Sequence, residues 1–166
     1  MKKKFYVFLD IDGVLYDWNY IKSLGPEHWG GVIVDFDPKS IEALNYLIAQ
    51  LKKEYDVELV ISSTWRSNME RTMQILINHG LKTEDLFISR TRNSTNPRYR
   101  GREIMDYLEN KRDKENYVII DDETFDFKEY FHDTRIIKTD IFISGLKREM
   151  VDIFLKNNNI IDNKKR

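Results

Sequence analysis

Short apolar runs alternate with amphipathic stretches along this chain. The clearest runs are Phe5–Leu9, Val57–Ile61 and Tyr117–Ile120, which are rich in β-branched and aromatic residues. Runs of this length and composition are typical of strands that are buried on both faces of a parallel sheet. Two further short runs, Leu86–Ser89 and Arg135–Lys138, also predict strands.

Apolar residues recur at helical spacing between these runs. Asp37 and Pro38 have the pattern of an N-cap and a first helical residue, and the apolar positions that follow are Ile41, Leu44, Leu47, Ile48 and Leu51. Ser67 and Glu70 have the spacing of a capping box for the next helix. Its apolar positions are Met73, Leu76 and Ile77, and Gly80 is expected to end it.

Two more helices complete the pattern. One carries Ile104 and Leu108, and the apolar positions of the last are Leu146, Met150, Ile153 and Phe154. Strands that alternate with helices predict an α/β fold with a doubly wound parallel sheet between two helical layers. The sequence contains no internal repeat and no linker, so its 166 residues predict a single domain with a core over about 5–155 and a polar tail over 156–166.

Composition narrows the chemistry. A hydrophobic content of 41% with 33% charged residues is that of an ordinary globular domain, and a net charge of -1 provides no overall attraction to nucleic acid or membrane. The absence of cysteine excludes disulfides and thiolate ligands and leaves oxygen ligands for a metal. The apolar stretch after the basic residues 1–4 is too short for a signal peptide or a membrane span. We therefore expect a cytoplasmic protein without membrane association, and no obligate protein partner is evident.

Each of the three clear strands ends in polar side chains. These are Asp10 and Asp12 after the first, Ser62, Ser63 and Thr64 after the second, and Asp121 and Asp122 after the third. The carboxyl ends of parallel strands form the ligand-binding edge of such sheets. Strand alternation predicts that Asp10 and Asp12 point the same way, and Gly13 permits a sharp turn after them. An Asp-x-Asp-Gly sequence alone is also an ordinary turn pattern, but the three strand ends together favour a site.

This group of side chains suits phosphoryl transfer. Carboxylates from two strands repel one another, and a bound Mg²⁺ relieves that repulsion. Mg²⁺ takes oxygen ligands from one or two carboxylates, from water and from a phosphate. Hydroxyl and basic groups nearby bind the other phosphoryl oxygens. The polar stretch 90–102 supplies the basic groups, namely Arg90, Arg92, Arg98, Arg100 and Arg102.

The motifs resemble those of a known superfamily. Asp10–Val14 resembles the first motif of the haloacid dehalogenase (HAD) superfamily, and the chain order of acid pair, hydroxyl, basic residue and acid pair is also that of the superfamily. Ser63–Arg66, Arg100–Ile104, Val118–Asp122 and Gly145–Leu146 are similar to a subgroup of small, nearly capless HAD domains, which includes those of RNA-repair polyproteins. The resemblance covers Phe5 to about Leu155 and implies a Rossmann-like HAD fold.

The resemblance implies a role for each motif residue. Asp10 is expected to be the nucleophile that becomes an aspartyl phosphate, and Asp12 the group that protonates the leaving oxygen and later takes a proton from water. Mg²⁺ is expected to bind the Asp10 carboxylate, the Asp12 backbone carbonyl and Asp121, with Asp122 close by or ligating through water. The residues expected to bind the substrate phosphate are Ser63, Thr64 and Arg100.

Several positions have alternatives. The alternatives for the hydroxyl, the basic residue and the second acid are Ser62 for Ser63, Arg102 for Arg100, and Asp126 for Asp122. Asp126 also suits the cap of a turn. Arg66 is expected either to contact the substrate or to be solvated. Trp65 is expected to be a packing residue rather than a platform on which a base stacks.

The substrate class depends on the size of the cap. Residues 14–36 are enough for a flap and residues 81–99 for a loop, but neither is enough for a cap domain. An open site admits bulky substrates, and arginines around Tyr99 suit a single-stranded nucleic-acid end. We therefore rank phosphorylated polynucleotide ends first, and nucleoside monophosphates, the substrates of a 5′- or 3′-nucleotidase, second.

Two other classes of protein use a similar fold. A non-catalytic HAD-fold binding module is one alternative. The other is a receiver-like signalling domain, in which the acid pair near the first strand is adjacent. The spacing of Asp10 and Asp12 by one residue argues against the receiver.

Overall fold

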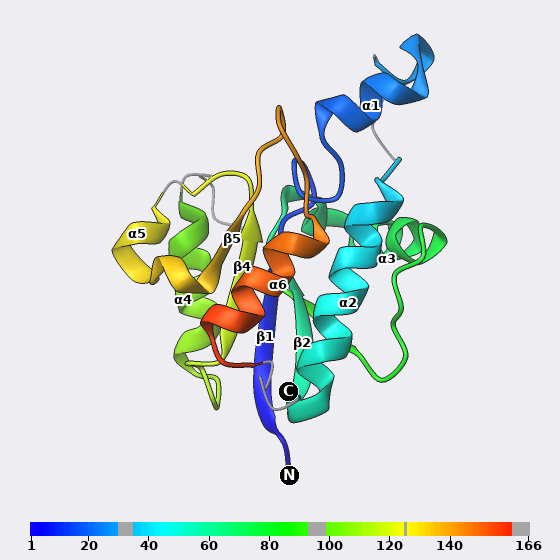
Figure 1. Cartoon of the computed structure of the whole chain (residues 1–166). Coiled ribbons are helices and arrows are strands. Elements are labelled where there is room, and N and C mark those ends of the chain that lie inside the picture. Colours follow the sequence, from blue (N-terminus) through cyan, green and yellow to red (C-terminus); the bar gives the residue numbers. More distant parts are fainter. Residues whose placement is uncertain (30–34, 93–98, 125, 161–166) are drawn as a thin grey trace.

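The computed structural model describes residues 1–29, 35–92, 99–124 and 126–160. A five-stranded parallel sheet in the order β3-β2-β1-β4-β5 forms the centre of the molecule (Figure 1). The strands are β1 (Lys3–Leu9), β2 (Tyr55–Ile61), β3 (Phe87–Arg90), β4 (Tyr117–Asp121) and β5 (Ile136–Lys138). All five predicted strands are therefore confirmed, with ends that differ by one or two residues.

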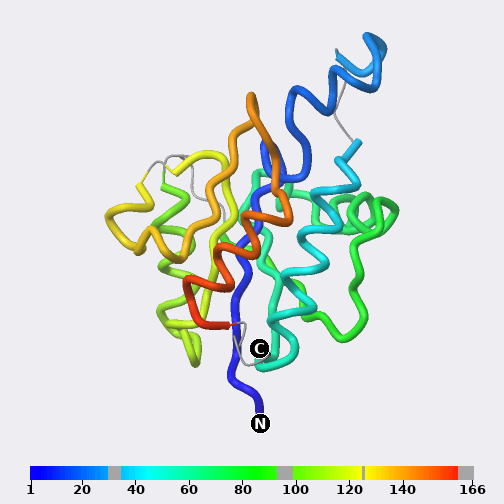
Figure 2. Tube along the Cα trace, viewed as in Figure 1, coloured from blue at the N-terminus to red at the C-terminus, as the bar shows by residue number. Residues whose placement is uncertain are grey.

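Helices lie on both faces of this sheet, as Figures 1 and 2 show. The α-helices are α1 (Trp18–Leu24), α2 (Pro38–Glu54), α3 (Met69–Asn78), α4 (Arg100–Glu109), α5 (Phe127–Tyr130) and α6 (Arg148–Asn157). The described residues also form the short 3₁₀ helices η1 (Pro26–His28), η2 (Thr64–Asn68) and η4 (Asp133–Arg135).

The central strand β1 divides its side chains between two cores. Phe5, Val7 and Leu9 belong to the larger cluster, which includes buried residues of α2, α3 and α6. Tyr6 and Phe8 belong to the smaller cluster, with residues of α4 and α5. Because successive side chains of a strand point to opposite faces, this division confirms the predicted three-layer, doubly wound architecture.

Helix α2 begins as predicted, with Asp37 as N-cap and Pro38 in its first turn. The predicted capping box of α3 is wrong, because Ser67 lies inside η2 and the N-cap is Asn68, whose side chain accepts a hydrogen bond from the Arg71 amide at 3.1 Å. The 3₁₀ turn after β2 moves the start of α3 by one residue.

Helix α4 begins earlier than the sequence predicts. Arg100 and Arg102, which were expected in a loop, form its first turn. The Asp126 side chain accepts hydrogen bonds from the amides of Gly101 at 2.7 Å and Arg102 at 3.0 Å. The helix is thus capped by a residue remote in sequence, which local pattern does not reveal.

Two apolar positions of the predicted helices are on the surface. Ile77 of α3 is 46% exposed and Ile153 of α6 is 60% exposed. A third predicted helix position, Leu146, is buried but precedes the start of α6. In α6 the buried positions are Val151, Phe154 and Leu155.

Parts of three sequence predictions lie outside the described residues. These parts are 30–34 of the flap, 93–98 of the arginine-rich stretch, which includes Arg98, and 161–166 of the tail. The described part of the flap contains α1, which Asp17 caps through a hydrogen bond from the Tyr20 amide at 2.9 Å. Among the described residues, no helix combines the length and apolar content needed to cross a membrane.

Burial in α6 predicts a difference in stability between two neighbouring truncations. Leu155 is 0% exposed and Ile153 is 60% exposed. We expect Leu155→Ala to lower the free energy of unfolding by about 2–5 kcal/mol, because it leaves a cavity, and Ile153→Ala to change it by about 0.5 kcal/mol or less. Urea denaturation of both variants measures the difference, and equal losses would contradict the packing of α6 on the sheet.

Candidate active site

Three carboxylates meet at the carboxyl edge of the sheet. Asp10 follows β1, Asp121 ends β4 and Asp122 follows it, and one oxygen of each lies within 4.8 Å of the others. Parallel pairing sets this juxtaposition, because β1 and β4 are neighbours and the Asp10 amide donates to the Ile120 carbonyl at 3.0 Å. Asp10 is 3% exposed and Asp121 is 0% exposed, so the cluster lies in a low-dielectric environment.

Arg100 lies between two of these carboxylates. Its Nη1 is 2.7 Å from Asp121 Oδ2 and 3.1 Å from Asp10 Oδ2. Burial lowers the pKa of the Arg100 guanidinium, but the charges of Asp10 and Asp121 more than offset burial, so the net shift of the pKa is upward. Arg100 therefore stays charged and binds the two strand ends together.

One guanidinium does not neutralise three carboxylates. Burial raises the pKa of Asp10, against the opposing effects of Arg100 and the nearby Ser63 hydroxyl. Burial and the Asp10 charge raise the pKa of Asp121 well above its usual value. Burial, Asp10 and Glu123 raise the pKa of Asp122 to about 7. The cluster therefore favours an additional positive charge.

Gly13 makes room for the third carboxylate. Its φ is 70°, in the left-handed region, and a Cβ at this position would overlap the side chain of Asp122. The turn after β1 and the acid pair after β4 are thus packed against one another, and only glycine fits both the backbone conformation and the space.

Asp12 has different partners from Asp10. Its Oδ1 accepts hydrogen bonds from the Tyr16 hydroxyl at 2.8 Å and from the Trp65 indole nitrogen at 2.9 Å. The prediction that the two side chains point the same way stays a prediction, and the cluster of Asp10, Asp121 and Asp122 does not include Asp12. These two donors, both on Oδ1, restrict the orientation of the Asp12 carboxylate.

The hydroxyl motif lies at the end of β2, next to β1. Ser62 and Ser63 are both 0% exposed, and Thr64 is exposed at the start of η2. The Ser62 hydroxyl has no hydrogen-bond partner, whereas the Ser63 hydroxyl lies near enough to Asp10 to affect the pKa of Asp10. This proximity favours Ser63 over Ser62 as the hydroxyl beside Asp10.

Arg66 is neither solvated nor at the surface. It is 6% exposed, and its Nη2 donates to Glu103 Oε2 at 2.7 Å. Its Nη1 donates to the carbonyls of Ser62 and, at 3.1 Å, Ser63. Glu103 is in α4, one turn from Arg100, so the ion pair connects the helix that carries Arg100 to the loop that carries Ser63.

The alternative residues have other positions. Arg102 is exposed, whereas Arg100 is in the acid cluster. Asp126 caps α4, as described above, and Asp122 is the second acid of the cluster. Trp65 packs against Phe36, with ring centroids 5.7 Å apart, in addition to its bond to Asp12.

The sequence pattern predicts no role for Tyr16 or for Glu103. Tyr16 follows Asp12 by four residues, and no local pattern separates it from the other aromatic residues of the flap. Glu103 follows Arg100 by three residues, which is the spacing of one helical turn. That spacing is a signal only once the start of α4 at Arg100 is known.

The acid cluster fits a hard divalent cation. Its donors are carboxylate oxygens, and Asp10 Oδ1 is buried with no hydrogen-bond partner among the described residues. A buried oxygen without a partner is costly in a protein unless it has a ligand. Asp10, Asp121 and Asp122 are the residues that could hold such an ion.

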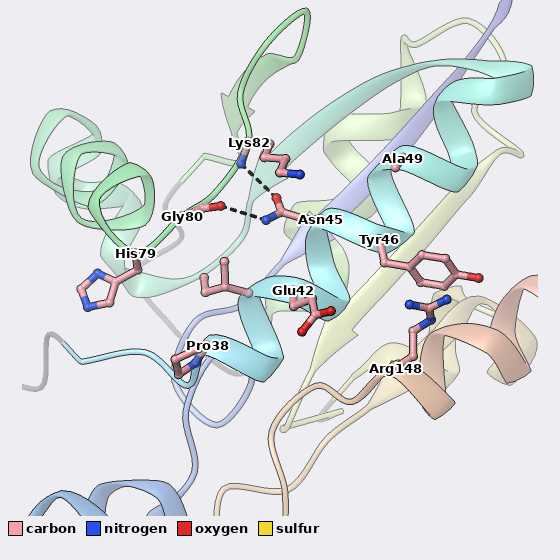
Figure 3. A pocket seen from close by; sticks show the side chains of 10 residues that line it. Pro38, Glu42, Asn45, Tyr46, Ala49, His79, Gly80, Lys82 and Arg148 are labelled. Atoms are coloured by element: carbon pink, nitrogen blue, oxygen red, sulfur yellow. Dashed lines mark hydrogen bonds between the residues drawn. The ribbon is translucent and has the colours of Figure 1, made fainter.

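A separate hollow of about 440 Å³ lies along the outer side of α2 (Figure 3). Asn45 there accepts a hydrogen bond from the Lys82 amide at 2.9 Å and donates to the Gly80 carbonyl at 2.8 Å. The Arg148 guanidinium lies over the Tyr46 ring, 3.1 Å from its centroid. None of the lining residues belongs to the acid cluster or the hydroxyl motif, and Arg66 and Arg100 do not line the hollow. The hollow is therefore not part of the candidate site.

The sheet order, the acid cluster and the buried arginine together define a HAD-type domain. The chain belongs to the family described as the HAD domain in Swiss Army Knife RNA repair proteins, whose model matches residues 6–151. Comparisons with curated proteins and with solved structures gave no match. Membership of a HAD family indicates a hydrolase of the phosphatase type.

The buried ion pair predicts a large effect of one truncation on stability. We expect Glu103→Ala to lower the free energy of unfolding by about 3–5 kcal/mol, because it leaves the buried Arg66 charge without its carboxylate. The matched control is Asp152→Ala, because Arg148 and Asp152 form an exposed ion pair at 3.6 Å. This variant should change the free energy of unfolding by about 1 kcal/mol or less. Urea denaturation tests both, and a Glu103→Ala loss as small as that of the control would show that the pair does not hold the site together.

Proposed function

We propose that this protein is a Mg²⁺-dependent phosphomonoesterase that acts on phosphorylated polynucleotide ends through an aspartyl phosphate on Asp10. The observation that carries the proposal is the Asp10 carboxylate, which is buried beside Asp121 and Asp122 and contacted by Arg100 at 3.1 Å. This arrangement supports Asp10 as the nucleophile, the acid cluster as the site of a cation and Arg100 as the phosphate-binding guanidinium.

In the first step an Asp10 oxygen attacks phosphorus and the bond from phosphorus to the leaving oxygen breaks. Arg100 and the Ser63 hydroxyl bind phosphoryl oxygens, with Thr64 at the exposed side of the same loop. Protonated Asp12 donates its proton to the leaving oxygen, because an alkoxide of ribose is a poor leaving group unless it is protonated.

In the second step water attacks the phosphorus of the aspartyl phosphate. The Asp12 carboxylate takes a proton from that water, and the bond between phosphorus and the Asp10 oxygen breaks to release inorganic phosphate. Asp12 performs both proton transfers from one position, and its hydrogen bonds from Tyr16 and Trp65 restrict that position.

Asp10, Asp121 and Asp122, with the Asp12 backbone carbonyl, would hold Mg²⁺, which would supply positive charge to offset the negative charge of the phosphoryl group. The raised pKa values of the three carboxyl groups, caused by burial and mutual repulsion, support a preference of the cluster for a cation.

Two observations support polynucleotide ends as the substrate class. The family description refers to RNA repair proteins, and the arginines at this edge include exposed Arg90, Arg92 and Arg102. Nucleoside monophosphates are the second candidate, since they have the same phosphate and terminal nucleoside as a phosphorylated polynucleotide end. A non-catalytic binding module has less support, because each residue type that the reaction needs is present.

The test of function is phosphate release with and without Mg²⁺. Its panel contains 3′- and 5′-phosphorylated oligonucleotides, nucleoside monophosphates, a phosphopeptide and an aryl phosphate. We expect oligonucleotide ends to have the highest kcat/KM, and Asp10→Asn to lower turnover by about 10³-fold or more with an unchanged circular dichroism spectrum. Preference for mononucleotides would favour the nucleotidase, and no Mg²⁺-dependent release from any substrate would favour the binding module. An active Asp10→Asn variant would exclude the covalent mechanism.

The contacts of Asp12 predict a dependence on the leaving group. We expect Asp12→Asn to retain Mg²⁺ binding in calorimetry and to lose turnover. Tyr16→Phe and Trp65→Phe each remove one hydrogen bond to Asp12, so we expect each to lower kcat for an alkyl phosphate by about tenfold.

The same variants should lower kcat less for a nitrophenyl phosphate, whose leaving oxygen needs no proton. The matched control is Tyr46→Phe, a tyrosine of the hollow on α2. Equal losses for both substrates would mean that Tyr16 and Trp65 support the fold and do not position the proton donor.

A further inference from the structure

A short hairpin stands at the same edge of the sheet as the acid cluster. It spans 139–145 and connects β5 to α6, and Figure 1 shows it rising above the sheet next to α1. Asp140 and Ser144 pair in an antiparallel bridge. At its tip, Phe142 is 72% exposed and Ile143 is 70% exposed. These are the two most exposed large apolar side chains among the described residues, apart from Met1 at the start of the chain.

The backbone of this tip is held in place. The Ser144 amide donates to the Asp140 carbonyl at 2.8 Å, and the Phe142 amide donates to the Asp140 side chain at 2.8 Å. From the flap, the Trp18 amide donates to the Ile141 carbonyl at 2.8 Å, and the Asn19 side chain donates to the Ile143 carbonyl at 3.0 Å. The two apolar side chains are therefore presented on a fixed turn.

Both ends of the hairpin contact segments of the proposed active site. At its start the Thr139 amide donates to the Asp121 carbonyl at 3.0 Å. At its end the Leu146 amide donates to the Val14 carbonyl at 2.7 Å, and a Cβ on Gly145 would be 2.7 Å from that carbonyl oxygen. The hairpin thus stands over the edge between the Asp121 strand and the turn that follows Asp12.

Exposed charge and exposed apolar surface at this edge come from opposite borders of the sheet. Exposed Arg90 and Arg92 are at the end of β3, while the hairpin follows β5, at the other border of the sheet. Neighbouring strands are about 4.8 Å apart, so β5 is roughly 10 Å from β1. A substrate that contacts both Asp10 and the hairpin after β5 is therefore larger than a phosphate group alone.

We propose that the Phe142–Ile143 tip is a stacking platform for a base of a single-stranded polynucleotide whose terminal phosphate is at Asp10. Binding of single strands combines basic groups that follow the backbone with aromatic side chains on which bases stack. This proposal rests on the proposed function and adds a residue that selects polynucleotide ends over small phosphate esters. Phe142 is a specificity residue in this role, because it contacts a base and not the reacting atoms.

The experiment compares one oligonucleotide and one small ester in each variant. The substrates are a hexanucleotide with a terminal phosphate and a nitrophenyl phosphate, and the readout is the ratio of their kcat/KM values. We expect Phe142→Ala to lower this ratio by about tenfold, as for the loss of one base–aromatic stack. Phe142→Trp should restore the ratio, and Phe142→Leu, which is apolar but has no ring, should not.

Phe87→Ala is the matched control. Phe87 is 59% exposed but begins β3, at the amino edge of the sheet and away from Asp10, so both kcat/KM values should stay at the wild-type level. Fluorescence anisotropy with a labelled hexanucleotide and the Asp10→Asn protein, with and without Phe142→Ala, measures the same contact without turnover. We expect binding to weaken by about tenfold.

The possible failures are distinguishable. A Phe142→Ala protein with the wild-type ratio would overturn the platform and leave the proposed function standing. A wild type that hydrolyses the nitrophenyl ester but none of the oligonucleotides would overturn the proposed substrate class and the platform together. A change of oligomeric state in Phe142→Ala, measured by sedimentation velocity, with no change in the ratio would assign the tip to contact with another protein chain.

Discussion

The structure depends on the accumulation of buried negative charge where β1 and β4 end side by side. Asp10 and Asp121 are almost completely buried. Asp122, the third member of the cluster, lies against the turn at Gly13. Carboxylates in such a position repel one another strongly. Arg100 offsets part of this repulsion by contacting Asp10 and Asp121, and its position in turn requires α4 to begin where it does.

The position of Arg100 depends on several further contacts. Asp126 caps the first turn of α4, and the ion pair of Glu103 with Arg66 connects the same turn to the loop after β2. Arg66 also binds the carbonyls of Ser62 and Ser63. Ser63 and Arg100, which belong to two separate motifs, are thus held at a fixed separation by one buried salt bridge, and the proposed phosphoryl transfer needs such a geometry.

The described residues of the segments 14–36 and 81–99 form no cap domain, which gives the surface around the site a greater role. The part of the flap that the structure describes contains the short helix α1, and the hairpin 139–145 is hydrogen-bonded to it. With an open edge, the groups that distinguish one phosphate ester from another must lie on the rim. Exposed arginines and the exposed Phe142 at this edge suit the proposed substrate, which has both phosphates and bases.

The sequence alone determined the strands, the helical layers and the set of motif residues at the sheet edge. These features follow from local periodicity and from the rule that parallel strands end together. Only the tertiary structure decided which donors hold Asp12, how Arg66 is neutralised and where α4 begins. Each depends on residues far apart in the chain: Trp65 is 53 positions from Asp12, Glu103 is 37 from Arg66, and Asp126 is 25 from Gly101. Local pattern contains no information on such pairs, because packing of whole helices against the sheet brings them together.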